Sequence, residues 1–450
     1  MANDSQRGII ALLFVGVLMG ALDISIVGPA IPSIEEALRI NSHQSGWIFS
    51  IYVLFNLIGI SLFARLSDVF GRRNIYILAL AIFAAGSLVV SMAGNFDLIM
   101  VGRAVQGLGA SGIFPVASAL VGDLFPLEKR GRILGLIGAV FGIAFLVGPF
   151  IAGILLKYFS WNVLFIINLP VALVLIFYSY RLLPSVSTLG FRDIDWPGII
   201  LLGGGLAVLT LGLNNIVSFR ISSVVNFFET LLPFLIFAAT IIALYLFERR
   251  AKNPIIKFGF FMNYQVLIVG LIASVTGIMQ ACFVFIPKFV VLIFSVDPSA
   301  ASFMLIPIVL ATAIGSPVFG RMIDKYGVKI IVIIGLVLSA SGFFMLSLFA
   351  EIKTLYYLSG ALIGLGLSVL AGSSLRYIML KNTIVEDRAT SQGMLTIFTS
   401  VGQLFGAAFI GLILLSQPDK KGFEMIFAGV SALILVMFFL SFGIKGEKGN

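Results

Sequence analysis

Fourteen apolar runs follow one another along this chain, each close to the roughly 20 residues that a helix needs to cross a bilayer. Hydrophobic residues make up 60% of the sequence and charged residues 11%, too few polar groups to cover a soluble protein of this size. The runs are continuous and do not alternate with polar residues, which favours helices over barrel strands. We therefore predict an all-α integral membrane protein with 14 transmembrane helices. Their approximate bounds are Gly8–Pro29, Gly46–Leu66, Ile75–Ala93, Leu98–Ala119, Ile133–Leu156, Val163–Tyr180, Gly198–Ile216, Leu231–Phe247, Val266–Val291, Ala301–Val318, Ile330–Phe349, Leu355–Leu375, Gly393–Ser416 and Met425–Phe442.

Lysine and arginine are distributed unevenly between the predicted loops. With the N-terminus inside the cell, the inner segments carry 21 of the 29 basic residues and the outer segments carry 6. Because basic residues concentrate on the cytoplasmic side of multi-span proteins, this bias predicts a multi-pass protein of the cell membrane with both termini in the cytoplasm. It also accounts for the net charge of +9 without a nucleic-acid partner.

A short segment occurs twice in the chain. Residues 64–73 read ARLSDVFGRR and residues 320–329 read GRMIDKYGVK, and each copy lies at an inner turn between two predicted spans. Related halves joined in tandem are the sequence mark of many secondary transporters. The two halves match if six spans form each bundle and spans seven and eight are an inserted pair.

The first copy contains Asp68, Gly71, Arg72 and Arg73, and it resembles the signature loop of the major facilitator superfamily. An aspartate at a helix end can hold an arginine and neighbouring helix N-termini together in one state and release them in another. The resemblance implies a gating role for these four residues and for Asp324 in the second copy. The alternative is that the basic residues only anchor the membrane topology.

Two further segments resemble motifs of particular groups within the superfamily. In span five, Gly142 precedes Gly148, Pro149 and Gly153, a pattern similar to the motif that marks antiporters in the superfamily. In span one, residues 22–32 (LDISIVGPAIP) are similar to the first-helix motif of its fourteen-helix drug–proton antiporters. Plain packing of small residues is the alternative for span five. The resemblance covers nearly the whole chain.

The resemblance implies the major facilitator fold, with two six-helix bundles plus two inserted helices. The expected divisions are residues 1–185 for the N-terminal bundle, 186–257 for the inserted pair (spans seven and eight) and 258–450 for the C-terminal bundle. A monomer is sufficient for such a transporter, because both halves lie in one chain.

Asp23 in span one and Arg103 in span four are candidates for proton coupling. Arg103, Gln106 and Gly107 share a helix face and resemble the second motif of the superfamily. Asp23 lies about 22 Å from the inner face and Arg103 about 8 Å from the outer face, depths that coincide in a core of about 30 Å. The two side chains are therefore predicted to form a pair if spans one and four are neighbours, as they are in the fold that the resemblance implies. Burial favours a protonated carboxyl and a nearby guanidinium favours an ionised one, so alternation would let Asp23 load and release a proton. A static structural pair is the alternative reading.

Other polar residues within the spans are candidates for substrate binding, and each could instead make an interhelical hydrogen bond. They are Tyr52, Asn56, Gln106, Gln280 and Gln403. The single cysteine, Cys282, excludes an intrachain disulfide, and with the single histidine, His43, it leaves no cluster for a metal. We expect no metal and no cofactor.

The function these features favour is export of amphipathic, drug-like small molecules, with cations among the candidates, by proton antiport with alternating access. The partners implied are the small-molecule substrate, protons and the lipid bilayer. The alternative is export of a lipid or an endogenous metabolite by the same fold, and a more distant one is a membrane sensor or scaffold that does not transport. No G-x-x-x-x-G-K-[ST] loop is present, and no residue cluster of an enzyme is visible, so we expect neither ATP drive nor catalysis.

Overall fold

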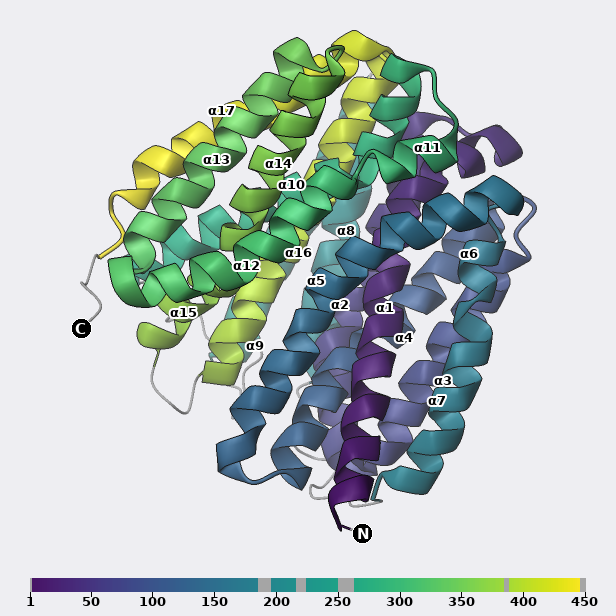
Figure 1. Cartoon of the computed structure of the whole chain (residues 1–450), viewed down its shortest axis with the longest axis vertical. Coiled ribbons are helices and arrows are strands. Elements are labelled where there is room, and N and C mark those ends of the chain that lie inside the picture. Colours follow the sequence, from purple (N-terminus) through teal and green to yellow (C-terminus); the bar gives the residue numbers. More distant parts are fainter. Residues whose placement is uncertain (1, 185–195, 216–223, 250–262, 384–387, 446–450) are drawn as a thin grey trace. The chain divides into compact units, whose positions relative to one another are not determined.

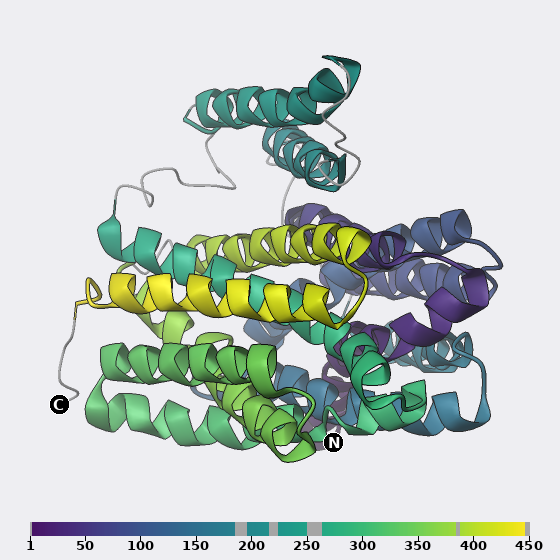
Figure 2. The same ribbon diagram turned by 90° about the horizontal axis from the view of Figure 1, so that it is seen from above.

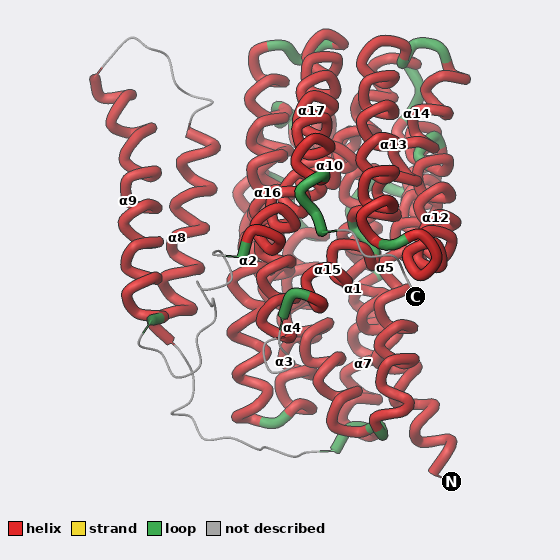
Figure 3. Tube along the Cα trace, turned by 90° about the vertical axis from the view of Figure 1, so that its left-hand side faces the viewer, coloured by secondary structure: helices red, strands yellow, loops and turns green. Residues whose placement is uncertain are grey.

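The computed structural model describes residues 2–184, 196–215, 224–249, 263–383 and 388–445. Within these ranges the regular elements are helices and no strand occurs (Figure 3). In this described part, 11 helical segments are long and apolar enough to cross a membrane. Three shorter apolar segments, Gln44–Ile60, Val147–Tyr158 and Ile200–Leu213, fall at the remaining predicted spans. The all-helical membrane class is confirmed, and the number of fourteen spans stays a prediction.

The chain divides into two compact units, which we describe separately. The first unit contains α1 (Ala2–Leu38), most of α2 (Ser42–Phe70), α3 (Arg72–Ser91), α4 (Phe96–Leu124), α5 (Leu127–Tyr158), α6 (Val163–Ile166) and α7 (Asn168–Leu182) (Figure 1). The second unit contains α10 (Tyr264–Phe294), α11 (Pro298–Phe303), α12 (Ile306–Tyr326), α13 (Val328–Phe349), α14 (Lys353–Leu370), α15 (Ser373–Lys381), α16 (Arg388–Ser416) and α17 (Lys420–Ser441).

Two helices, α8 (Trp196–Asn215) and α9 (Val224–Glu248), are each divided between the two units. They correspond to predicted spans seven and eight. The predicted domain boundaries after residues 185 and 257 lie outside the described residues, so they stay predictions.

The same pairs of helices pack together inside each unit. The first span contacts the fifth, as α1 with α5 and α10 with α16, and the third contacts the fourth, as α3 with α4 and α13 with α14. The first span also contacts the sixth in both units, and Figure 2 shows this for α17 (yellow) beside α10 (teal). This repeated packing agrees with the turn sequence that occurs twice in the chain.

Three spans predicted as single helices are interrupted. The sixth divides into α6 and α7, the tenth into α11 and α12, and the twelfth into α14 and α15. Pro170 lies in the first turn of α7 and Pro307 in the first turn of α12, where a missing N–H needs no acceptor. A Cβ on Gly372, between α14 and α15, would lie 2.2 Å from the carbonyl oxygen of Ser368, so the backbone there suits only glycine.

The core of the first unit is built on a close approach of α3 and α4. A Cβ on Gly86 would lie 2.4 Å from the backbone nitrogen of Gln106, and one on Gly109 would lie 2.3 Å from that of Phe83. Small residues let membrane helices approach this closely, and dispersion contacts then replace contacts with lipid. The approach positions the polar residues of α4 directly against α3.

Candidate functional site

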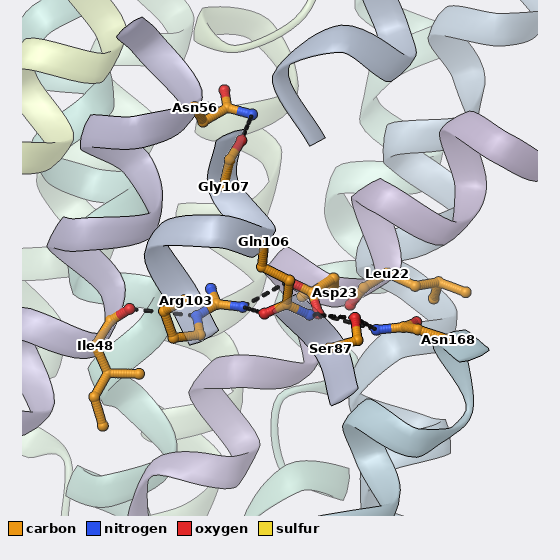
Figure 4. A network of polar contacts seen from close by, with 10 residues as sticks. Leu22, Asp23, Ile48, Asn56, Ser87, Arg103, Gln106, Gly107 and Asn168 are labelled. Atoms are coloured by element: carbon orange, nitrogen blue, oxygen red, sulfur yellow. Dashed lines mark hydrogen bonds and ion pairs between the residues drawn. The ribbon is translucent and has the colours of Figure 1, made fainter. Parts of the chain in front are cut away.

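A buried ion pair joins α1 to α4 in the first unit. The Nη1 atom of Arg103 donates to the Oδ2 atom of Asp23 at 2.7 Å (Figure 4). Both residues are completely buried. The contact predicted from the matching depths of the two residues is confirmed. Since leaving one member of a buried pair alone costs about 3–5 kcal/mol, any state that separates these helices must neutralise or re-pair Asp23.

Gln106 closes a ring of hydrogen bonds with this pair. Its Oε1 atom accepts from Nη1 of Arg103 at 2.7 Å, and its Nε2 atom donates to Oδ1 of Asp23 at 2.7 Å. Arg103 and Gln106 are three residues apart on α4, so both side chains reach the same point on α1. The amide thus holds the acid and the guanidinium in one geometry.

Two further polar residues complete the network from α3 and α7. The Nδ2 atom of Asn168 donates to Oδ1 of Asp23 at 3.2 Å and to Oγ of Ser87 at 3.3 Å. Nε2 of Gln106 also donates to Oγ of Ser87, at 2.8 Å. Asp23 therefore accepts hydrogen bonds from three side chains, an arrangement that stabilises a carboxylate.

Two aromatic rings lie close to the Arg103 guanidinium. Its Cζ atom lies 4.1 Å from the centroid of the Tyr52 ring and 5.9 Å from that of Phe165. Its Nε atom donates to the carbonyl oxygen of Ile48 on α2 at 3.4 Å. Because the face of an aromatic ring attracts a cation, Tyr52 and Phe165 stabilise the guanidinium beside Asp23.

The backbone near this network leaves no room for larger residues. A Cβ on Gly107 would lie 2.3 Å from the carbonyl oxygen of Tyr52, so glycine is what lets α2 and α4 meet here. On α1, Ser25 packs against Gly148 of α5, and its Oγ atom donates to the carbonyl oxygen of Ala144 at 3.0 Å. The contact with α5 is therefore two residues from Asp23.

The predicted antiporter motif is the source of that α5 contact. Gly148, Pro149 and Gly153 are buried. Gly142 lies in α5, outside the described side-chain positions. The packing of Gly148 on Ser25 is consistent with the packing reading, and the antiport role stays a prediction.

The predicted gating turns share one backbone conformation. Gly71 joins α2 to α3 with φ 89°, and Gly327 joins α12 to α13 with φ 82°, in a region that side chains rarely adopt. Arg72 donates from Nε to Oδ2 of Asp123 at 3.0 Å and from Nη1 to Oγ of Ser67 at 2.6 Å. These contacts join the α2–α3 turn to the end of α4.

Other predicted gating residues are only partly described. The guanidinium of Arg73 lies over the ring of Tyr180, with 5.3 Å from Cζ to the centroid. The side chains of Asp68 and Asp324 lie outside the described residues. Their pairing stays a prediction.

The substrate-binding candidates fall in different places. In the first unit, Tyr52 and Gln106 are buried in the Asp23 network, and Nδ2 of Asn56 donates to the carbonyl oxygen of Gly107 at 3.4 Å. In the second unit, Nε2 of Gln403 donates to Oε1 of Gln280 at 2.7 Å, and both side chains are partly exposed. Their roles in binding stay predictions.

Sequence reasoning missed Ser87, Asn168 and Asp123. An asparagine within the sixth apolar run is a signal that could have been used, since polar residues inside spans are costly. Ser87 is one of many serines in the spans, and only packing selects it. Asp123 follows the fourth run and looks like an ordinary loop acid. Among the described residues, no group of three or more His, Cys, Asp or Glu side chains could hold a metal ion.

Two helical units with the same internal packing, one of them with a buried acid–arginine pair, define the architecture of a secondary transporter. The family model described as Major Facilitator Superfamily matches residues 13–291 and again residues 267–449. The chain therefore belongs to the major facilitator superfamily and is a multi-pass membrane transporter.

Relatives and solved structures agree with this assignment. The chain is 27% identical over 419 residues to Multidrug resistance protein 3 of Bacillus subtilis (strain 168), covering 91% of this chain and 80% of that protein. It is 28% identical over 374 residues to Riboflavin transporter RibZ of Clostridioides difficile (strain 630), covering 81% of this chain and 78% of that protein. The crystal structure of the nucleoside transporter NupG matches with a TM-score of 0.68 at 13% identity, over 98% of each chain. At that identity the similarity shows the fold alone.

Proposed function

We propose that this transporter exports amphipathic, drug-like small molecules in exchange for protons, with Asp23 as the proton carrier and Arg103 as its counter-ion. The observation that carries the proposal is the completely buried pair of Asp23 and Arg103. Among the described residues, the other buried carboxylate is Glu248, at the last position of α9. Similarity to Multidrug resistance protein 3 supports the substrate class.

The proton step follows from the energetics of this pair. In the arrangement described above, Asp23 is matched by a cation and two amide donors, and these contacts favour the carboxylate. If α1 moves relative to α4 during alternating access, the carboxylate loses the guanidinium in a low-dielectric site. Taking up a proton then costs less than leaving the charge unpaired, since an isolated buried charge neutralises instead.

A second candidate is export of an endogenous metabolite by the same mechanism. The similarity to Riboflavin transporter RibZ favours it, because riboflavin is a metabolite. The partly exposed amide pair Gln280 and Gln403 suits a neutral polar substrate, because its amides can donate and accept. Both candidates share the proton step at Asp23.

The remaining features of the proposal concern topology. We propose fourteen spans, both termini in the cytoplasm and a monomeric transporter of the cell membrane. The bias of basic residues toward the predicted inner loops supports the orientation. The apolar segments Gln44–Ile60, Val147–Tyr158 and Ile200–Leu213 support the span count.

The test is efflux of a fluorescent lipophilic cation from proteoliposomes with an imposed pH gradient. We expect gradient-driven transport by the wild type and its loss in Asp23→Asn, because an amide cannot exchange a proton. Asp97→Asn is the matched control, since Asp97 is exposed on α4. Unchanged transport by Asp23→Asn would remove Asp23 from the mechanism. Transport of riboflavin, but not of the cation, would favour the second candidate.

A further inference from the structure

An apolar pocket opens on the surface of the first unit between α1, α5, α6 and α7. Its volume is about 140 Å³, close to that of the apolar cavities of about 150 Å³ that stay dry and bind benzene. Nine of its ten lining side chains are hydrocarbon or thioether, among them Leu22, Ile26, Ile151 and Leu164. The exception is Asn168. The pocket therefore excludes charged groups and accepts apolar ones.

The exposed residues around the pocket indicate which molecules can enter it. Val15 and Ile167 line the pocket and are 39% and 43% exposed, and the nearby residues Phe150 and Ile154 on α5 are 48% and 41% exposed. All of these residues lie in apolar helical segments of membrane-spanning length or in Val147–Tyr158. The exposed residues of membrane-spanning segments are surrounded by the hydrocarbon tails of lipids.

Asn168 connects this pocket to the buried ion pair. Asn168 is one of the residues that line the pocket, and its Nδ2 atom donates to Asp23 at 3.2 Å and to Ser87 at 3.3 Å. Asn168 is the first residue of α7, directly after the break that separates α6 from α7. A group that enters the pocket therefore packs against a residue whose amide stabilises the Asp23 carboxylate.

We propose that the pocket takes one acyl chain of a bilayer lipid and that Asn168 is the positioning residue through which this chain acts on Asp23. A chain in the pocket packs against the Asn168 side chain and changes how well its amide donates to the carboxylate. Lipid composition then adjusts how readily Asp23 takes up a proton. The second part of this proposal rests on the proposed proton-carrying role of Asp23, and the first part does not.

Occupancy is tested by photolabelling in proteoliposomes with a phospholipid that carries a diazirine near one chain end. We expect adducts on peptides of α1 and α7 that contain the lining residues, and a several-fold loss of labelling in Val171→Trp, which fills the pocket. Val174→Trp is the matched control, since Val174 lies on the same helix, is 54% exposed and does not line the pocket. Leu18→Phe fills the pocket from α1 and replaces Val171→Trp if that variant does not fold.

Two results would overturn the occupancy. One is equal labelling of these peptides in the wild type and in both filled variants. The other is complete displacement of the lipid probe by tetraphenylphosphonium at transport concentrations, which would make the pocket a substrate site. Persistence of labelling with this cation present supports the lipid chain.

The connection to Asp23 is tested by infrared titration of its carboxyl band, assigned by its absence in Asp23→Asn. We expect Val171→Trp to change the proton affinity of Asp23 by about two- to threefold or more, and we expect the same substitution to change nothing in an Asn168→Ala background. An equal change in both backgrounds would overturn the role of Asn168. A carboxyl band that does not titrate at all would instead contradict the proposed function, whatever the photolabelling shows.

Discussion

Gln106 contacts Asp23 through its amide nitrogen at 2.7 Å, while its carbonyl oxygen accepts from the guanidinium that pairs with the same acid. One neutral side chain thus contacts both members of the ion pair. Because the ring of contacts is closed, the acid and the arginine are oriented by a third residue on α4. The polar network is a unit whose parts depend on one another.

Replacing this amide tests that dependence. Gln106→Leu removes a donor from Asp23 and Ser87 and an acceptor from Arg103, all of them buried. We expect the free energy of unfolding to fall by about 1–3 kcal/mol, since buried polar groups lose partners. The measurement is thermal unfolding in detergent, with Gln417→Leu, at an exposed position, as the control. Equal stability of the two variants would contradict the closed ring.

The approach of α2 and α4 at Gly107 gives a second prediction. In Gly107→Ala the new methyl group would lie 2.3 Å from the carbonyl oxygen of Tyr52, so the helices must separate. We expect a loss of about 1–3 kcal/mol, typical of overpacking, and slower transport. Gly122→Ala on the same helix meets no atom within 4 Å and should be neutral or stabilising. The measurement is urea or thermal unfolding of both variants. Similar losses of stability in the two variants would exclude the contact between Gly107 and Tyr52 as the cause.

The turn at Gly71 gives a third prediction. In Gly71→Ala a residue with a side chain must keep φ near 89° and ψ near 139°, a conformation that costs about 1–3 kcal/mol. We expect lower stability and lower transport. Gly204→Ala, in α8 with open space around it, should change neither property. A wild-type transport rate in Gly71→Ala would contradict this prediction, because the turn would then relax without any loss of transport.

The pair of Arg72 and Asp123 gives a fourth prediction. The two side chains are 20% and 54% exposed, so the pair adds only about 0–1 kcal/mol to stability. If it holds one conformational state, however, Asp123→Asn should change the transport rate several-fold while leaving the melting temperature nearly constant. The double variant Arg72→Asp with Asp123→Arg should recover part of the rate. A swap that recovers nothing, with Asp123→Asn already inactive, would indicate a role for Asp123 other than pairing.

Some of the site can be predicted from the sequence because depth in a bilayer is almost linear in residue number along a helix. This relation places Asp23 and Arg103 at one level, and the structure joins them at 2.7 Å. Which residues of α3 and α7 turn toward them depends on packing between helices. Ser87 and Asn168 therefore cannot be identified as part of the site from single apolar runs of the sequence.

Breaks within helices are a second feature that the apolar runs of the sequence do not show. An apolar run looks the same whether its backbone is continuous or interrupted, so α6 and α7 are predicted as one span. The interruption places Asn168 at a helix start, where its side chain reaches the α1 carboxylate. The stacking of Tyr52 on Arg103 also depends on packing between helices, and the predicted role of Tyr52 in substrate binding stays a prediction.

The single-residue turns have a mechanical consequence. Gly71 alone separates α2 from α3, and Gly327 alone separates α12 from α13. Two torsion angles are then the whole freedom of each joint, and both are held in a narrow glycine conformation. A rotation of one helix about its axis is therefore transmitted to the next helix, because no flexible linker lies between them to absorb the rotation. Each single-residue turn acts as a stiff mechanical coupling between two helices.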